Sequence, residues 1–174
     1  MNDVYSRRAV MQNERKTYIF LAVSDSHNDK DTLERIIKKE ADADLIIHLG
    51  DGIEKFEDLM IGLRKINVSV KGNSDNDNIA QPVTKTITFF GKKLFLAHGH
   101  TFDVKTTYDK IIEKAWSENA DLCLFGHMHQ QYINVVNGMT ILNPGAVSCF
   151  HEYAVIKITD GVIRAELKCL KNND

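Results

Sequence analysis

The sequence repeats one pattern five times: a short apolar run is followed at once by residues that can bind a metal ion. Short apolar runs are typical of strands buried within a sheet. Parallel strands of an α/β sheet end at a common edge, so the residues that follow them can converge on one site. The five motifs are Asp25-Ser26-His27, Gly50-Asp51, Gly72-Asn73, His98-Gly99-His100 and His127-Met128-His129.

The first and last motifs each place two ligand side chains two residues apart. On extended backbone, residues i and i+2 point to the same side of the chain. We therefore expect both motifs to be extended, so that each pair of side chains faces a single site.

The first half of the chain alternates strand and helix patterns. Residues 18–24, 44–49 and 68–70 have the apolar character of buried strands, whereas residues 29–40 and 54–65 carry apolar side chains at helical spacing. A β-α-β-α-β order favours parallel strands joined by helices on the faces of the sheet.

The second half contains more strands and shorter connections. We expect strands at residues 83–90, 92–97, 122–125, 131–136, 139–142, 153–159 and 162–168, and a helix at residues 105–119. Asn137-Gly138 and Asp160-Gly161 predict tight hairpin turns, because these pairs accept positive φ. The layout predicts an α/β fold, a four-layer α-β-β-α sandwich with two mixed sheets.

The length of 174 residues favours a single domain over residues 17–174, preceded by a polar, basic tail over residues 1–16. The net charge of −2 gives no reason to expect nucleic-acid binding, and no apolar run is long enough to cross a membrane. No secretory signal is visible, and the three cysteines are far apart. We therefore expect reduced thiols in a cytoplasmic protein.

The motif loops offer more ligands than one tetrahedral zinc ion needs. They suit two metal ions of five or six coordination, and the mixture of oxygen and imidazole suits Mn, Fe, Zn, Co or Ni rather than Mg or Ca alone. We expect Mn, with Ni, Zn, Fe or Co as alternatives. Two divalent cations carry four positive charges, of which two carboxylates and a bridging hydroxide remove three. A centre near +1 suits a phosphate ester. The candidate ligands are Asp25, His27, Asp51, Asn73, His98, His127 and His129.

The ordered motifs resemble those of the calcineurin-like metallophosphoesterase superfamily. Gly72-Asn73-Ser74-Asp75 and Asn143-Pro144-Gly145 resemble its small microbial branch, the YfcE-type phosphodiesterases, over roughly residues 17–168. The resemblance implies that Asp25, His27 and His129 bind one metal ion, that Asn73, His98 and His127 bind a second, and that Asp51 bridges them.

The resemblance also implies a phosphodiesterase in which a metal-bridging hydroxide attacks phosphorus, with Asp51, Asn73, His98 and His100 as catalytic residues. Many phosphatases of the superfamily have a histidine where this chain has Ser74, and that histidine helps to protonate the leaving oxygen. A serine hydroxyl is a poor general acid near neutral pH. We therefore expect a small, activated phosphodiester as the substrate, with His100 and Asp75 as candidate proton donors.

Two alternatives remain open. One is a phosphomonoesterase, nucleotidase or pyrophosphohydrolase of the same superfamily. The other is a non-catalytic scaffold resembling the retromer vacuolar-sorting subunit, whose metal site is altered, whereas every ligand position here holds a competent residue. Any assembly is expected to be a symmetric homodimer. His48 is interpreted as a buried residue of the core or beside the site, Glu54 as a first-turn helix residue, and Asn143-Pro144-Gly145 as a structural turn.

Overall fold

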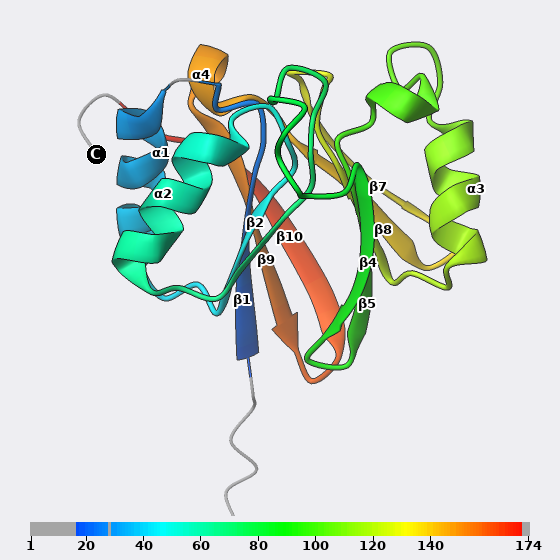
Figure 1. The fold of residues 1–174 in the computed structure, drawn as a ribbon. Helices are drawn as coiled ribbons and strands as arrows, with labels where there is room; N and C mark the ends of the chain where they lie inside the picture. Colours follow the sequence, from blue (N-terminus) through cyan, green and yellow to red (C-terminus); the bar gives the residue numbers. More distant parts are fainter. Residues whose placement is uncertain (1–16, 28, 172–174) are drawn as a thin grey trace, which may run out of the picture.

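The computed structural model describes residues 17–27 and 29–171. Two five-stranded sheets pack face to face, with helices on both outer sides (Figure 1). This arrangement confirms the predicted four-layer sandwich. The predicted tail over residues 1–16 lies outside the described residues, and the assignment of residues 17–174 to one domain stays a prediction.

The first sheet has the strand order β10-β9-β1-β2-β3. Strands β1, β2 and β3 are parallel, whereas β9 runs antiparallel to β1 and β10 antiparallel to β9. The parallel strands therefore end at one edge, where the first three motifs follow them. The strands are β1 (Thr17–Val23), β2 (Leu45–His48), β3 (Asn67–Ser69), β9 (Glu152–Thr159) and β10 (Val162–Cys169).

The second sheet has the strand order β4-β5-β6-β8-β7. Its three central strands β5, β6 and β8 are parallel, and the outer strands β4 and β7 are antiparallel to their neighbours. The motifs at residues 98–100 and 127–129 follow β5 and β6. The strands are β4 (Thr84–Phe89), β5 (Lys92–Ala97), β6 (Leu122–Phe125), β7 (Gln131–Val136) and β8 (Met139–Pro144).

The helices cover the outer faces of the two sheets (Figure 1). Helices α1 and α2 pack on the first sheet, and α3 packs on the second. The short helices α4 and η1 were not predicted, because they are too short to show a helical period in the sequence. The helices are α1 (Lys30–Lys39), α2 (Ile53–Leu63), η1 (His100–Phe102), α3 (Asp109–Ser117) and α4 (Val147–Phe150).

Successive residues of the central strands pack alternately into two hydrophobic clusters, one between the sheets and one beneath the helices. In β1, Phe20 and Ala22 lie between the two sheets, whereas Leu21 and Val23 pack against α1 and α2. This is the two-residue period of a strand with both faces buried. Uniformly apolar sequence in β1 and β2 is therefore explained by burial on both sides.

The helix predicted at residues 105–119 begins later, at Asp109. Asp103 has a φ of 53°, and the backbone N–H of Thr106 donates to its carbonyl oxygen at 2.8 Å. Thr107 Oγ1 then accepts from the backbone N–H of Asp109 at 3.2 Å. Threonine side chains that bond the backbone favour turns and helix starts over helix interiors, which explains the delayed start. Within the described residues, no helix is both long and apolar enough to span a membrane.

Candidate metal centre

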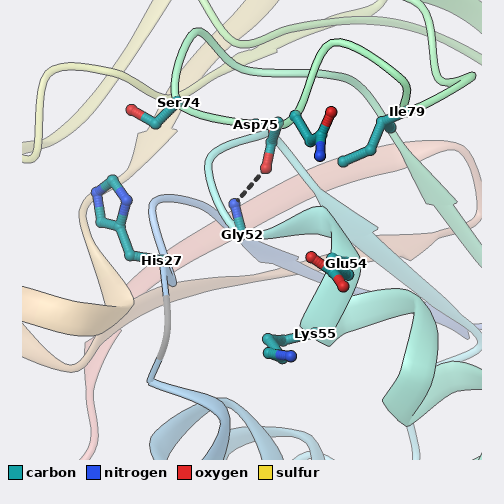
Figure 2. A pocket seen from close by; sticks show the side chains of 8 residues that line it. His27, Gly52, Glu54, Lys55, Ser74, Asp75 and Ile79 are labelled. Carbon is teal, nitrogen blue, oxygen red and sulfur yellow. Dashed lines mark hydrogen bonds between the residues drawn. The ribbon is translucent and has the colours of Figure 1, made fainter.

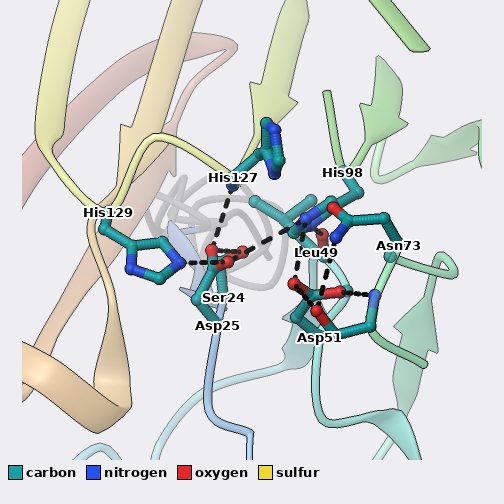
Figure 3. Close-up of polar contacts among 12 residues, drawn as sticks. Ser24, Asp25, Leu49, Asp51, Asn73, His98, His127 and His129 are labelled. Atoms are coloured by element: carbon teal, nitrogen blue, oxygen red, sulfur yellow. Dashed lines mark hydrogen bonds and ion pairs between the residues drawn. The ribbon is translucent and has the colours of Figure 1, made fainter. Parts of the chain in front are cut away.

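The five motif loops meet where the carboxyl ends of the parallel strands of both sheets come together. Backbone hydrogen bonds join the loops directly: the Asp25 N–H donates to Gly50 at 3.0 Å and the His27 N–H donates to Asp51 at 2.8 Å. In the second sheet, the Gly126 N–H donates to His98 at 3.0 Å. Figure 3 shows the resulting cluster of carboxylate, imidazole and amide groups.

Asp25 lies fully buried at the centre of this cluster. Its Oδ2 accepts from Ser24 Oγ at 2.6 Å and from the backbone N–H of His127 at 3.0 Å. Its Oδ1 is also buried but makes no hydrogen bond of good geometry with any described residue. The histidine nitrogens closest to Oδ1 are His129 Nε2 at 2.9 Å and His98 Nε2 at 3.9 Å.

Two groups of donor atoms have the compactness that a metal ion requires. Asp25, His27 and His129 form the first group, and Asp25, Asp51 and His98 form the second, with the donor atoms of each group within 4.8 Å of one another. Asp25 belongs to both groups. Five of the seven predicted ligands are therefore together, and a carboxylate lies between the two groups.

The remaining predicted ligands, Asn73 and His127, lie at the edge of the second group. The His127 ring centroid is 5.0 Å from that of His98. Asn73 is exposed, and its amide Nδ2 donates weakly to Ser74 Oγ at 3.3 Å. Figure 3 shows the Asn73 side chain facing Asp51 and His98.

His98 is oriented by its other ring nitrogen. Its Nδ1 lies 2.8 Å from the carbonyl oxygen of Leu49, which can only accept, so Nδ1 carries the proton. Its Nε2 is buried, has no hydrogen-bond partner among the described residues and lies 3.4 Å from Asp51 Oδ2. A backbone carbonyl that sets the tautomer in this way is typical of a metal-binding histidine.

The electrostatics of the centre favour positive charge. Burial by itself would lower the pKa of His98, but the nearby carboxylates of Asp51 and Asp25 raise it above its usual value. Burial opposes ionisation of Asp51, yet His98 and two bonds from Ser74 hold the pKa of Asp51 below its usual range. The buried acceptor atoms and this preference for positive charge fit a divalent cation.

The ligand loops are not extended, so the expectation of extended backbone in both paired motifs is wrong. Asp25, His27, His127 and His129 have φ values of 52°, 45°, 68° and 53°, and Asp51 has a φ of 59°. This left-handed region is uncommon for residues other than glycine and tends to mark functional sites. Tight turns, not strand geometry, point these side chains toward one another.

His100 and His127 are less closely tied to the donor groups than His98. The His100 ring centroid is 5.5 Å from that of His98, and its Nδ1 is buried without a hydrogen-bond partner among the described residues. Burial, followed by the charge of His98, lowers the pKa of His100. Burial and the charges of His98 and Lys105 lower the pKa of His127 to about 4.

Several residues that support the centre were missed or only partly recognised from the sequence. Ser148, which had no predicted role, donates from Oγ to the Asp25 carbonyl oxygen at 2.8 Å. His48 is fully buried beside the site, and its ring contacts Ser26 Oγ at 2.8 Å. Asn143 donates to the Gly126 carbonyl oxygen at 2.8 Å, in keeping with a structural turn below His127. The contact of Ser148 could not be predicted from the sequence, because its partner Asp25 lies 123 positions away in the chain.

Comparisons with known proteins show which proteins the chain resembles. Residues 19–161 match the calcineurin-like phosphoesterase superfamily domain. Over 133 residues, 73% of each chain, the sequence is 33% identical to YsnB of Bacillus subtilis, a probable metallophosphoesterase. A predicted phosphoesterase from Streptococcus pneumoniae has a similar crystal structure, with a TM-score of 0.76, 26% identity and coverage of 88% of this chain and 90% of that chain. Vacuolar protein sorting 29 of Cryptosporidium parvum has a similar fold, with a TM-score of 0.72, 13% identity and coverage of 87% and 97%.

Proposed function

The chain belongs to the calcineurin-like phosphoesterase superfamily, and we propose that it is a phosphodiesterase that uses two divalent metal ions. The observation that carries the proposal is the position of Asp25. Its carboxylate is shared by two compact donor groups, and Asp25 Oδ1 and His98 Nε2 are buried without hydrogen-bond partners among the described residues. Leaving such atoms buried without a hydrogen bond, close only to other donor atoms of the site, is costly unless they bind a cation.

We assign Asp25, His27 and His129 to one ion, and Asn73, His98 and His127 to the other, with Asp51 between them. The first set matches a complete donor group. Asp51 and His98 belong to the second group, which also includes Asp25. When bound, two such ions lower the pKa of water and offset the charge of the phosphoryl group. We infer manganese as the metal ion, because both oxygen and imidazole ligands are present.

The position of Ser74 favours an activated phosphodiester over an ordinary alkyl monoester. Ser74 Oγ donates to Asp51 Oδ2 at 3.0 Å, and the Ser74 backbone N–H donates to Asp51 Oδ1 at 2.8 Å. The hydroxyl proton is therefore already engaged with a proposed metal ligand. This contact orients Asp51 but leaves no strong acid at position 74 to protonate an alkoxide, so substrates with good leaving groups are favoured.

The first test compares two chromogenic substrates after the metal has been stripped from the protein. Hydrolysis of bis-p-nitrophenyl phosphate and p-nitrophenyl phosphate is measured after Mn²⁺, Ni²⁺, Zn²⁺ or Mg²⁺ has been restored separately. We expect restored activity, greatest with Mn²⁺, a clear preference for the diester, and two bound ions per chain by elemental analysis. Asp51→Asn should abolish this activity. Asp42→Asn, at an exposed position before β2 and thus at the opposite end of that strand from Asp51, serves as the matched control.

Each contrary result has a definite meaning. A preference for the monoester would indicate a phosphomonoesterase or nucleotidase. One ion per chain would contradict the two-metal proposal. The absence of hydrolysis with every metal would favour a scaffold. The similarity to vacuolar protein sorting 29 is a similarity of fold and does not by itself indicate that role.

A further inference from the structure

A cavity of about 320 Å³ lies beside the candidate metal centre, between the first turn of α2 and the loop that follows β3. Figure 2 shows His27 at one end, Glu54 and Lys55 on the helix side, and Ser74 and Ile79 on the loop side. Its volume lies at the lower end of the range for small-molecule sites. The cavity is thus large enough for a compact substituent of a phosphate ester.

The cavity is continuous with the proposed reaction centre. His27 lines it and also belongs to the first donor group. Ser74 lines it and donates to Asp51 of the second donor group. A phosphoryl group held between the two donor groups would therefore have one of its ester substituents next to this cavity.

The helix side of the cavity presents two charged side chains that are available to bind a ligand. Glu54 is exposed and Lys55 is half-buried, and within the part of the chain that the structure describes neither side chain has a hydrogen bond or ion pair. On the loop side, Asn76 Oδ1 accepts from the backbone N–H of Asn78 at 2.9 Å, which leaves the Asn76 amide N–H groups as donors. Ile79 adds one apolar surface.

A second phosphate does not suit the cavity. The N–H groups of Gly52 and Ile53 at the start of α2 already donate to Asp75 Oδ1, at 2.7 and 3.0 Å. The charge of Lys55 is offset by that of Glu54 next to it. Because backbone N–H groups engage the Asp75 carboxylate, what remains is an acceptor on Glu54, donors on Lys55 and Asn76, and one apolar wall. This is the chemistry that recognises a hydroxylated ring.

We propose that this cavity binds a neutral, sugar-like substituent of the phosphodiester, with Glu54 accepting hydrogen bonds from vicinal hydroxyl groups. Lys55 and Asn76 donate to the ring, and Ile79 packs against its less polar face. Carboxylates are well suited to such hydroxyls, as in the recognition of ribose by dinucleotide-binding folds. This inference rests on the proposed function and adds the class of substrate. The ring belongs either to a nucleoside or to a hexose.

The test uses three p-nitrophenyl phosphodiesters that differ only in the second substituent: uridine, glucose or methyl. We expect the full-length, Mn²⁺-loaded protein to hydrolyse at least one sugar ester with a kcat/KM about tenfold above that of the methyl ester. Glu54→Gln should reduce this preference about tenfold through KM, as the loss of a hydrogen bond to a charged group predicts. The matched control is Asp58→Asn, which removes the same charge from an exposed position one turn later in α2 and should keep the preference.

Equal kcat/KM values for all three esters would overturn the inference, as would an equal effect of Glu54→Gln on sugar and methyl esters. The uridine and glucose arms identify the source of the ring. If no ester is hydrolysed, the proposed function fails, and calorimetry with uridine 5′-monophosphate, glucose 6-phosphate and methyl phosphate decides the inference separately. Tighter binding of a sugar phosphate that weakens in Glu54→Gln supports the cavity, and equal binding of all three refutes it.

Discussion

The carboxylate of Asp75 holds the backbone of Asp51: Asp75 Oδ2 accepts from the Asp51 N–H at 2.8 Å. The same oxygen accepts from Gly72 at 2.8 Å, and Oδ1 accepts from Gly52 and Ile53. Burial would raise the pKa of Asp75, but these four N–H donors lower it overall. One side chain thus joins the loop of a proposed metal ligand to the next motif loop and to the start of α2.

Replacing Asp75 with asparagine should loosen the metal centre. An amide keeps one acceptor oxygen but turns its NH₂ group toward two N–H donors, which leaves them unpaired at a cost of about 1–3 kcal/mol each. We expect Mn²⁺ binding to weaken about tenfold or more, as measured by calorimetry, together with a lower Tm.

The control for Asp75→Asn is Asp77→Asn. Asp77 is exposed and contacts Lys71 at 3.3 Å, a surface ion pair of small value. Unchanged Mn²⁺ affinity in Asp75→Asn would show that the Asp51 loop is held without this carboxylate.

Gly72 and Gly62 should respond in opposite ways to alanine. A Cβ at Gly72 would overlap Asp51 Oδ1 and the Asp51 backbone nitrogen, whereas a Cβ at Gly62, within α2, meets no atom within 4 Å. We expect Gly72→Ala to lose most metal binding, and Gly62→Ala to stabilise the protein by about 0.5–1 kcal/mol through helix propensity. Thermal unfolding with and without Mn²⁺ measures both effects, and a Gly72→Ala protein that binds Mn²⁺ normally would contradict the packing seen here.

Ser74→His should broaden the substrate range. A histidine at this position can supply the proton that a poor leaving group needs, and general acid catalysis typically contributes about 10²–10⁴-fold. We expect the rate with an alkyl monoester, glycerol 2-phosphate, relative to bis-p-nitrophenyl phosphate, to rise at least tenfold. Ser74→Ala is the control, and it should retain the diester preference; an equal rise in both variants would mean that proton donation is not the cause.

His48 should make the metal-free protein less stable in acid. Burial lowers the pKa of His48 to about 4, and the Gly50 N–H donates to its Nδ1 at 3.1 Å, so the ring is neutral when folded. As pH falls below about 6.5, the unfolded chain binds the proton first, and stability is lost until pH reaches about 4. The shift corresponds to about 3 kcal/mol.

Urea unfolding between pH 7 and 4, in the presence of a chelator, measures this loss. His48→Asn keeps an acceptor near Nδ1 but cannot titrate, so its stability should depend less on pH than that of the wild type. His127 titrates in the same direction and remains in both proteins. A ring resonance of His48 that titrates near pH 6.5 in the folded state would refute the prediction.

The succession of strands along the chain and the identity of the candidate ligands could be predicted from the sequence, because both depend on local patterns. Buried strands such as β2 and β6 appear as apolar runs, and the residue after each run is a potential ligand by its chemistry alone. The side chains of Asp25, Asp51 and His98 could therefore be named before their contacts were known. The assignment of all seven to two metal ions stays a prediction.

The conformation of the loops could not be predicted in the same way. Asp25 is held by the His127 N–H, 102 positions away, and by the Ser148 hydroxyl, 123 positions away, and Asp51 is held by Asp75, 24 positions away. Such contacts exist only after segments distant in the chain have come together, and they stabilise left-handed backbone that local propensity disfavours. The sequence by itself determined which elements form and which side chains can bind metal. The tertiary structure alone decided how the loops turn and that a polar cavity opens beside His27, because both depend on contacts between segments that are distant in the chain.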